Sequence, residues 1–484
     1  MENPVQQLGV TKRIGDPIHG LIRLTSKEFE VLKSDFYQRL RRIKQLGIAE
    51  YVYPGATHNR FTHSLGMLQN VTEMFDAAFK NWSRAPQISG DIEADALFSK
   101  DVLEMTRLAA LCHDLGHLPL SHNLEDAIDW LAETKIIKEP FRHEQISSAI
   151  IHKELSHILG DFTDDIAKMI EGDYFNLSIP MFPNFLVSSA IDGDRADYLI
   201  RDSVYCGVDY GRFDKGRLLD SLYPHRVKIA GKNYDVLGFH GKGIEAVEEF
   251  LLARHRMHQT IYFNRSVVAF EAAMKRAYYQ ITTDNPPWEL PDQFVENPKT
   301  ILDFDDANFY VLLKKELLKR DIWLKDALLF RQSVKKFGPY YYTLTSGDNA
   351  TDTEKFIHLS EVRDKLEKPS RDWYKQDHWV YTERKSQTLV KPLPKSINSN
   401  IDEYDDSHNL KKSILILNNQ GKLIDPTSFS AGQTFLPFIA GHTYYRFLFF
   451  CHKRDSDKLE AMVKPLQEYG ETNWQQRSLK TFFE

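Results

Sequence analysis

Cysteine is scarce in this sequence, and long apolar runs are missing. Only three cysteines occur among 484 residues, at positions 112, 206 and 451, without the paired spacing of a zinc finger. This usage excludes a disulfide-rich scaffold and fits a reducing compartment. No stretch reaches the ~18 apolar residues that cross a bilayer, and the first residues, MENPVQQLGVTKR, lack the apolar core of a signal peptide. We therefore expect a cytoplasmic protein with no membrane partner.

An excess of positive charge is missing as well. The chain has 62 Lys and Arg against 68 Asp and Glu, a net charge of −6, so nucleic acid is not indicated as a partner. Hydrophobic residues are 42% of the chain and charged residues 27%, the balance of a globular fold. Histidine, by contrast, is concentrated: eight of the 18 histidines lie between His58 and His157. The chemistry of the protein is therefore expected in that stretch.

Apolar residues recur at helical spacing through most of the first 280 residues. This periodicity predicts helices over 26–47, from near Arg60, over 102–112, over about 186–198, and over 244–280. Before the last of these helices, VKIAGKNYDVLGF predicts a β-hairpin with Gly-Lys-Asn as its turn. The sequence thus indicates a mainly α protein with a small β-hairpin.

The composition changes after the proline-rich segment 282–298, which is typical of a boundary or a surface crossing. Beyond it, SILILNNQGKLI predicts a strand and turn, and YYRFLFFC predicts a buried strand followed by a helix from about Asp457. Residues 345–355 and 384–412 are polar and predict loops. We therefore expect an N-terminal segment over 1–25, a helical domain over 26–285, and a smaller mixed α/β lobe over 286–484.

Four residues have the character of metal ligands: His63, the adjacent pair His113 and Asp114, and Asp194. Each lies in or at the end of a predicted helix with apolar turns around it, so each should point inward. A buried carboxylate is costly unless it is paired or binds a metal. Two imidazoles and two carboxylates suit Fe, Mn, Zn or Ni, whereas Mg²⁺ is more suited to substrate phosphates. The structural alternative is a core histidine at 63 and a helix ion pair at 194.

A second histidine cluster follows directly. HDLGHLPLSHNLED contains His117, His122 and Glu125, and His143 comes soon after in FRHEQ. Histidine titrates near neutrality and can donate a proton to a leaving oxygen. A nearby carboxylate would hold its tautomer and raise its pKa. The alternative is a polar surface helix with incidental histidines.

Two further features concern substrate. Arg60 can clamp a phosphate with two parallel hydrogen bonds, although a surface ion pair would explain it equally well. Asp194, Tyr198 and Asp202 are four residues apart, so one helical face would present a carboxylate, a ring and a second carboxylate. Tyr198 is otherwise a residue of the core.

At these residues the sequence resembles the HD superfamily, named for its His…His-Asp…Asp signature. More narrowly, it is similar to the HD-domain dNTP triphosphohydrolases, which include an animal enzyme with an added sterile alpha motif. The resemblance covers roughly residues 12–280. The matching blocks are DPIHG (16–20), QRLRRIKQLG (38–47), YPGATHNRFTHSLG (53–66), HDLGHLPLSH (113–122), RHEQ (142–145) and DRADYLIRD (194–202).

The resemblance implies a helical HD-domain core and a role for each matching residue. It makes His63, His113, Asp114 and Asp194 the metal ligands, and His122 the general acid for the nucleoside 5′-oxygen. Supporting residues would be Glu125, His143 and His117, with Arg60 on phosphate. The nucleotide pocket would be lined by Gln45, Leu46, Tyr198, Asp202, Arg254, His258 and Tyr262. One departure is Glu125, where the animal enzyme has Asp.

The family also binds a regulatory nucleotide near DPIHG and QRLR, at positions that here are Asp16, Lys33, Gln38 and Arg41. The animal enzyme has an acidic residue where this chain has Lys33. The resemblance therefore implies a nucleotide activator other than guanine, and a homo-oligomer in which a tetramer is favoured.

The function expected from these residues is hydrolysis of a dNTP to deoxynucleoside and triphosphate, at a site that holds a divalent transition metal, with Mg on the substrate phosphates. HD sites also carry out phosphodiesterase and nucleotidase reactions. A third interpretation is a non-catalytic nucleotide-sensing or nucleic-acid-binding protein, for example in phage defence. The proton donor at His122 argues against that interpretation, because a sensor does not need a proton donor.

Overall fold

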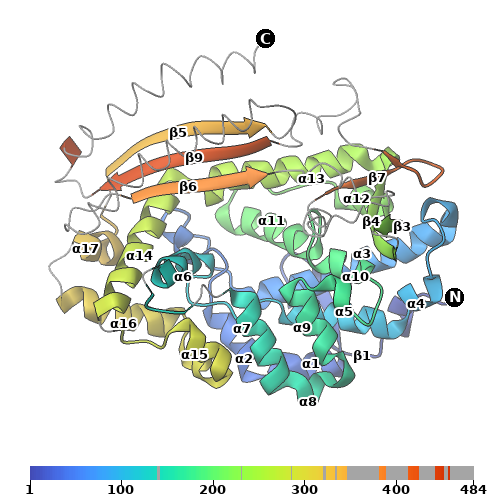
Figure 1. The fold of residues 1–484 in the computed structure, drawn as a ribbon, viewed down its shortest axis with the longest axis horizontal. Helices are drawn as coiled ribbons and strands as arrows, with labels where there is room; N and C mark the ends of the chain where they lie inside the picture. The colour runs from blue at the N-terminus through green and yellow to red at the C-terminus, as the bar shows by residue number, and fades with distance from the viewer. Residues whose placement is uncertain are drawn as a thin grey trace, which may run out of the picture.

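The computed structural model describes residues 1–332, except 134, 139–141, 230–231, 285 and 320–322, together with 335–345, 381–388, 413–424, 442–451 and 456–457. Helices dominate the described chain, as expected for a mainly α protein. Figure 1 shows a helical body with a three-stranded sheet along one edge. None of the helices in the described part is long and apolar enough to cross a membrane.

The helices follow one another along the chain with short connections. The first nine are α1 (Ser26–Lys33), α2 (Asp35–Arg39), α3 (Arg60–Arg84), α4 (Ala94–Leu97), α5 (Lys100–Cys112), α6 (His122–Glu133), α7 (His143–Ile150), α8 (Ser156–Leu159) and α9 (Thr163–Glu171). They are followed by α10 (Phe182–Val187), α11 (Gly193–Cys206), α12 (Lys215–Asp220), α13 (Ile244–Met257), α14 (Arg265–Asp284), α15 (Pro291–Glu296), α16 (Asp306–Lys319) and α17 (Trp323–Phe330).

The helix predicted from near Arg60 is confirmed as α3, and it lies in the middle of the core. Asn59 begins it by accepting a hydrogen bond from the Thr62 amide at 3.2 Å. Most of α3 is buried, because α5 and α11 pack against it. Tertiary burial on both sides, more than helix propensity, therefore fixes where its first turn lies. The helix predicted over 102–112 is also confirmed, as α5.

Three longer helices predicted from periodicity are interrupted. The helix predicted over 26–47 is divided into α1 and α2, because the Ser34 hydroxyl accepts the Tyr37 amide and starts a new helix. It is wrong for residues 43–46, where the chain leaves a 3-10 turn and Lys44 bridges to Asn59. The helix expected over 186–198 is broken between α10 and α11, where the carboxylate of Asp192 caps Arg195. A π-helical turn over His258–Tyr262 separates α13 from α14. Polar caps and a local change of helix type thus override the apolar pattern.

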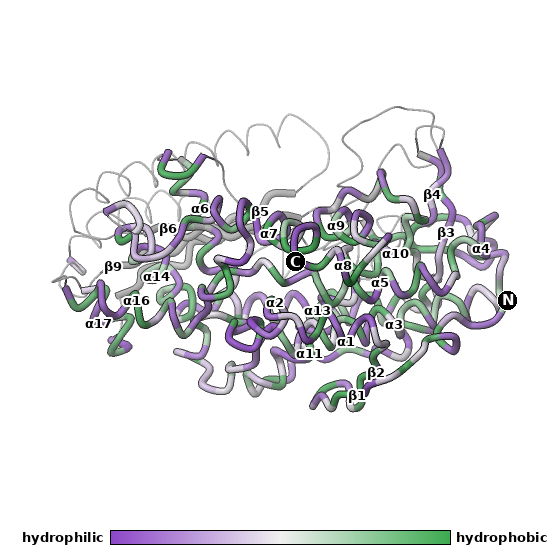
Figure 2. The backbone as a smooth tube through the Cα atoms, turned by 90° about the horizontal axis from the view of Figure 1, so that it is seen from below, coloured by the Kyte–Doolittle hydropathy of each residue, from purple (hydrophilic) through white to green (hydrophobic). Residues whose placement is uncertain are grey.

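Strands form three small sheets. β1 (Val10–Asp16) and β2 (Gly20–Thr25) make an antiparallel hairpin that projects from the body in Figure 2. The predicted hairpin is confirmed as β3 (Leu222–Ile229) with β4 (Lys232–His240), but the predicted Gly-Lys-Asn turn is wrong, because Lys232 and Asn233 already pair with Ile229 and Lys228 in the ladder. The strand and turn predicted in SILILNNQGKLI are confirmed as β7 (Leu415–Leu417) and β8 (Leu423–Ile424), and β7 adds in parallel to β4.

The third sheet has the order β5-β9-β6, all antiparallel. Its strands are β5 (Lys335–Thr345), β6 (Tyr381–Thr388) and β9 (His442–Cys451), and it lies next to α14. The strand predicted in YYRFLFFC is confirmed as part of β9. The loop predicted over 384–412 is wrong for residues 384–388, which pair with β9. The helix predicted from Asp457 falls almost wholly outside the described residues.

Candidate metal centre

Three packed helices bring the four predicted ligands together. His63 lies in the first turn of α3, His113 caps the end of α5 with Asp114 next to it, and Asp194 lies in the first turn of α11. One nitrogen from each imidazole and one oxygen of Asp194 lie within 4.8 Å of one another. The Asp194 carboxylate is 3.0 Å from His63 Nε2, and the Asp114 carboxylate is 3.1 Å from His113 Nε2. The arrangement gives mixed nitrogen and oxygen donors around one point.

The orientation of both imidazoles fits metal binding. His63 Nδ1 donates to Asp197 Oδ2 at 2.8 Å, and His113 Nδ1 donates to the Ala110 carbonyl at 2.8 Å. Nε2 of each ring is buried, and neither makes a hydrogen bond to any described residue. In its neutral form each ring would therefore present the Nε2 lone pair toward the two carboxylates, as metal-binding histidines do. The donor set can hold a divalent cation.

Charge in the centre is arranged around its carboxylates. Burial would raise the pKa of Asp114, but Arg60, His113 and His117 hold it well below its usual range. Burial likewise opposes ionisation of Asp194, yet the neighbouring His63, 3.0 Å away, lowers its pKa to about 2. Both acids are therefore charged at neutral pH. About a third of the Asp194 side chain is exposed, so the centre opens to solvent on that side.

The Arg60 guanidinium is already hydrogen-bonded to residues of the protein. Its Nη1 donates to Asp114 Oδ2 at 2.7 Å, and its Nε donates to the Ser121 hydroxyl at 2.7 Å. The side chain is buried. Two of its donors thus hold a ligand carboxylate and the loop before His122.

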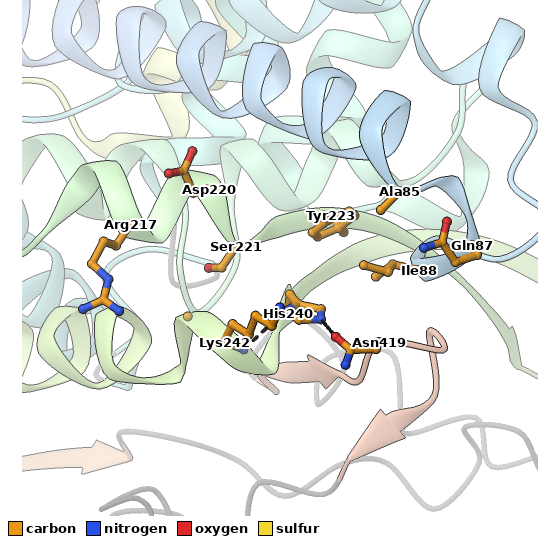
Figure 3. Close-up of a pocket in the computed structure, with 11 residues that line it drawn as sticks. Ala85, Gln87, Ile88, Arg217, Asp220, Ser221, Tyr223, His240, Lys242 and Asn419 are labelled. Carbon is orange, nitrogen blue, oxygen red and sulfur yellow. Dashed lines mark hydrogen bonds between the residues drawn. The ribbon is translucent and has the colours of Figure 1, made fainter.

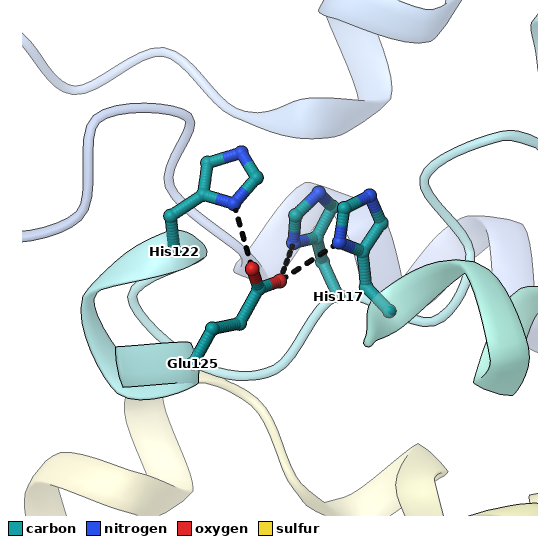
Figure 4. A group of neighbouring side chains, drawn as sticks. His117, His122 and Glu125 are labelled. Atoms are coloured by element: carbon teal, nitrogen blue, oxygen red, sulfur yellow. Dashed lines mark hydrogen bonds and ion pairs between the residues drawn. The ribbon is translucent and has the colours of Figure 1, made fainter. Parts of the chain in front are cut away.

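The predicted second cluster comes together beside the centre. Figure 4 shows Glu125, in the first turn of α6, pointing at His122 and His117. Its oxygens lie 3.0 Å from His122 Nδ1, 2.8 Å from His143 Nδ1 and 3.6 Å from His117 Nδ1. The His117 and His143 rings stack at 3.7 Å. Asp114 Oδ1 lies 3.1 Å from His117 Nε2, which connects the two clusters.

The members of this second cluster differ in protonation and exposure. Burial and the positive charge of Arg60 lower the pKa of His117 well below its usual value. The pKa of His143 is raised, because the charge of Glu125 outweighs burial. His122 is the exposed member, with 65% of its side chain accessible. Since Glu125 holds Nδ1, the free edge of His122 carries Nε2.

The residues expected to contact the sugar lie on the other side of Asp194. Asp202 is buried, and its oxygens bind His58 Nε2 at 2.7 Å and the Tyr262 hydroxyl at 2.6 Å. The Tyr198 ring meets the Tyr262 ring edge-on at 6.1 Å. Tyr198 and Tyr262 thus form an aromatic wall beside Asp194, whose charge acts on Tyr198, and Asp202 holds the Tyr262 hydroxyl.

The remaining predicted contacts flank this wall. The Gln45 amide donates to the His58 carbonyl at 3.0 Å, which brings Gln45 beside the same wall, and Leu46 packs on the core next to it. Arg254 lies in the last turn of α13, where burial and the charge of Arg195 lower its pKa. His258 follows in the π-helical turn, with its ring 5.0 Å from that of Tyr262.

The residues expected to bind a regulatory nucleotide fall into two places. Lys33 pairs with Glu30 on an exposed face of α1. Gln38 accepts from Arg41, whose guanidinium lies 3.5 Å over the Phe61 ring. Asp16, by contrast, lies at the end of β1 and pairs with the buried Arg201 of α11. The structure thus places Asp16 behind the metal centre.

Residues 304–306 anchor the loops around both clusters. The fully buried Arg39 donates to the Phe304 carbonyl at 2.6 Å and to the His117 carbonyl at 2.8 Å. Asp306 accepts from the Leu120 amide at 2.8 Å and from the Lys44 amide at 3.0 Å. The loop before His122 and the loop before Gln45 are therefore tied to one carboxylate.

Four side chains of the site were not singled out from the sequence: His19, Asp197, Arg201 and His58. All are inside or beside the blocks DPIHG, DRADYLIRD and YPGATHNRFTHSLG. Asp194, Asp197 and Arg201 are spaced at i, i+3 and i+7, which is one face of a helix. That spacing is the signal that could have found two of them.

A cavity of about 560 Å³ lies elsewhere, at the opposite end of α3 (Figure 3). Ala85 lines it, 22 residues from His63, which is about 33 Å along a helix that rises ~1.5 Å per residue. Its wall also includes Arg217, Tyr223, His240 and Lys242. The two sets of metal-type ligands found among the described residues both lie outside this cavity. The cavity is therefore separate from the candidate metal centre.

Comparison with known proteins covers the part of the chain that contains this centre. Residues 60–199 match the HD domain family, so this part of the chain is an HD domain. It is 35% identical over 273 residues to the uncharacterized protein MJ1154 of Methanocaldococcus jannaschii, covering 55% of this chain and 49% of that one. It is 32% identical over 245 residues to the deoxynucleoside triphosphate triphosphohydrolase SAMHD1 of Xenopus laevis, covering 43% and 37%.

A solved structure extends the likeness over the whole fold. A phosphohydrolase from Bacteroides thetaiotaomicron superposes with a TM-score of 0.63 at 22% identity, over 91% of this chain and 100% of that one. This similarity shows a shared fold. The chain spans about half or less of the length of these two curated relatives.

Proposed function

We propose that the chain is a metal-dependent phosphohydrolase that converts a dNTP and water to a deoxynucleoside and triphosphate. The observation that carries the proposal is the pair of buried, unpartnered Nε2 atoms of His63 and His113, which face the carboxylates of Asp114 and Asp194. The relatives named as deoxynucleoside triphosphate triphosphohydrolases support the choice of substrate. A bound divalent metal would supply Lewis-acid polarisation of a phosphoryl oxygen.

The residues around the centre suit a triphosphate ester. Arg195 and Arg254 lie beside Asp194 and Tyr198, where each can neutralise phosphate charge. A nucleoside 5′-oxygen leaves poorly as an alkoxide, so cleavage at the α-phosphorus needs a proton donor. The exposed His122 has Nδ1 held by Glu125, and its Nε2 is available to protonate that oxygen.

Selection of the sugar would come from the wall of Tyr198 and Tyr262. Asp202 fixes the Tyr262 hydroxyl, and His58 fixes Asp202 in turn. A rigid aromatic wall close to Asp194 would crowd a 2′-hydroxyl, so ribonucleotides should be poor substrates. Phosphodiesterase activity would not by itself require exclusion of a 2′-hydroxyl. Rejection of ribonucleotides would therefore favour the dNTP reaction.

The test is product analysis after incubating Mn²⁺-loaded protein with each dNTP, singly and in mixtures, in ¹⁸O-labelled water. We expect deoxynucleoside without label and tripolyphosphate with label, because water attacks the α-phosphorus and the 5′-oxygen stays with the sugar. Pyrophosphate or orthophosphate as the first product would contradict this function. Matching reactions with the four NTPs test the rejection of ribose.

A further inference from the structure

The carboxylate that orients His63 is itself held by the N-terminal hairpin. Asp197 accepts from His63 Nδ1 at 2.8 Å and from His19 Nε2 at 2.6 Å. It also accepts from Nε and Nη2 of Arg201, at 2.8 and 3.0 Å. The His19 ring is 4% exposed, and the side chains of Asp197 and Arg201 are fully buried. His19 lies in the turn between β1 and β2, remote in sequence from α11.

Asp16 completes this buried network from the same turn. Its carboxylate pairs with Arg201 at 2.9 Å. It also accepts from the backbone amides of Ile18 and His19, at 2.9 and 3.0 Å. One carboxylate thus shapes the turn and neutralises the arginine. The turn therefore presents His19 to Asp197 in a fixed geometry.

Gly66, one turn after His63 on α3, leaves room for the network. A Cβ atom added at Gly66 would lie 1.9 Å from Asp197 Oδ1 and 2.5 Å from Arg201 Nη2. Glycine is unfavourable in a helix interior compared with alanine. Glycine at position 66 therefore does not favour the helix itself. It allows the Asp197 carboxylate to lie close against α3.

We propose that His19, Asp16 and Arg201 are positioning residues of the metal centre, which act on the ligand His63 through Asp197. Asp197 holds the His63 ring with Nδ1 toward itself and Nε2 toward the centre, and it can do so only while its carboxylate is kept in place. The hairpin supplies His19, one of the two donors to the outer oxygen Oδ1; the other is Nη2 of Arg201. Partners of this kind set metal affinity through the orientation of the ligand they hold. The N-terminal hairpin is then part of the centre, and its displacement lowers metal affinity.

The inference rests on His63 as a metal ligand, as the proposed function does, but it is tested without nucleotide. We would measure the Mn²⁺ affinity of the full chain by calorimetry and the metal-free melting temperature by circular dichroism. His19→Ala should weaken Mn²⁺ binding by about 10–100-fold, the usual effect of losing such a partner, while the metal-free protein stays folded at the temperature of the titration. His19→Gln keeps an amide N–H near the position of Nε2 and should restore most of the affinity. His157→Ala, at an exposed position on α8, is the matched control.

Two further variants separate positioning from folding. Gly66→Ala should weaken Mn²⁺ binding although the same change ordinarily strengthens a helix. In a double-mutant cycle, His19→Ala should add little to Asp197→Asn, because both act on the same ligand. Wild-type affinity in His19→Ala and Gly66→Ala, or fully additive effects in the cycle, would overturn the inference. Metal binding by the wild type without dNTP hydrolysis would instead contradict only the proposed function.

Discussion

Arg60 Nη1 lies 2.7 Å from Asp114 Oδ2, and both side chains are almost completely buried. The arginine next to the centre is therefore the counter-ion of a candidate metal ligand. Arg60 therefore has a structural role that does not depend on any contact with phosphate.

Removing Arg60 should therefore destabilise the metal-free protein. Arg60→Ala leaves the Asp114 carboxylate buried without its partner, and breaking a buried pair in this way costs about 3–5 kcal/mol. The free energy of unfolding from urea denaturation checks the value. Arg212→Ala is the matched control, because Arg212 pairs with Asp209 at an exposed position and should have little effect. A loss below about 1 kcal/mol for Arg60→Ala would mean that the pair contributes little.

Removing a single ligand should abolish metal binding and leave the fold. His113→Ala and Asp194→Ala each take one donor from the centre, and the remaining donors then surround a gap. We expect metal content, measured by elemental analysis after dialysis, to fall together with activity. The far-UV circular dichroism should stay that of the wild type. Full metal occupancy in both variants would show that the metal binds elsewhere.

His122 should act on turnover more than on binding. His122→Ala removes the proton donor proposed for the 5′-oxygen, so kcat should fall about 10²–10⁴-fold while KM changes little. Steady-state kinetics with the preferred dNTP give both values. Glu125→Gln should reduce kcat less, because it keeps the shape of the carboxylate that holds His122. An unchanged kcat in His122→Ala would exclude it as the acid.

The His143–Glu125 pair should stabilise the fold in a defined pH window. Glu125 raises the pKa of His143 despite burial, so this stabilisation is complete below the unfolded histidine pKa of ~6.5 and is lost as pH rises through the folded value. The pKa of Glu125 is held well below its usual value by His122 and His143, again despite burial, so its contribution is lost only in acid. The stability difference between wild type and His143→Gln should be largest near pH 5–6 and smaller at pH 9. Urea unfolding at several pH values measures it, and a difference that grows toward pH 9 would reverse the assigned direction.

The sequence predicts the helices that carry the centre better than it predicts their ends. The apolar repeat of α3 runs unbroken from Phe61 to Phe79, about five turns, so the existence of the helix follows from periodicity alone. The break at Ser34 depends on one hydroxyl that caps α2, which competes with an apolar pattern that continues across it. Residues 384–388 form a strand because β9 pairs with them, and a polar segment carries little sign of such a partner.

Within the site, too, some residues could be predicted from the sequence and others could not. His63, His113, Asp114 and Asp194 stand out because their residue types are costly to bury unless they bind something. Asp197 is equally buried, but its sequence neighbours include several other acids, and only the fold shows which of them meets His63. His19 could not be predicted, because the contact joins a hairpin turn to a helix 178 residues further along.

Phe304 and Asp306 lie far beyond residue 199, where the HD domain match ends, yet they hold the loops that carry His117, Gln45 and His122. A fragment cut at residue 285 would leave the Arg39 guanidinium buried with part of its acceptors gone. It would also release the amides of Lys44 and Leu120 from their shared carboxylate. The smallest excised piece expected to keep a working centre must therefore include Asp306, the first residue of α16, although the family match ends at residue 199.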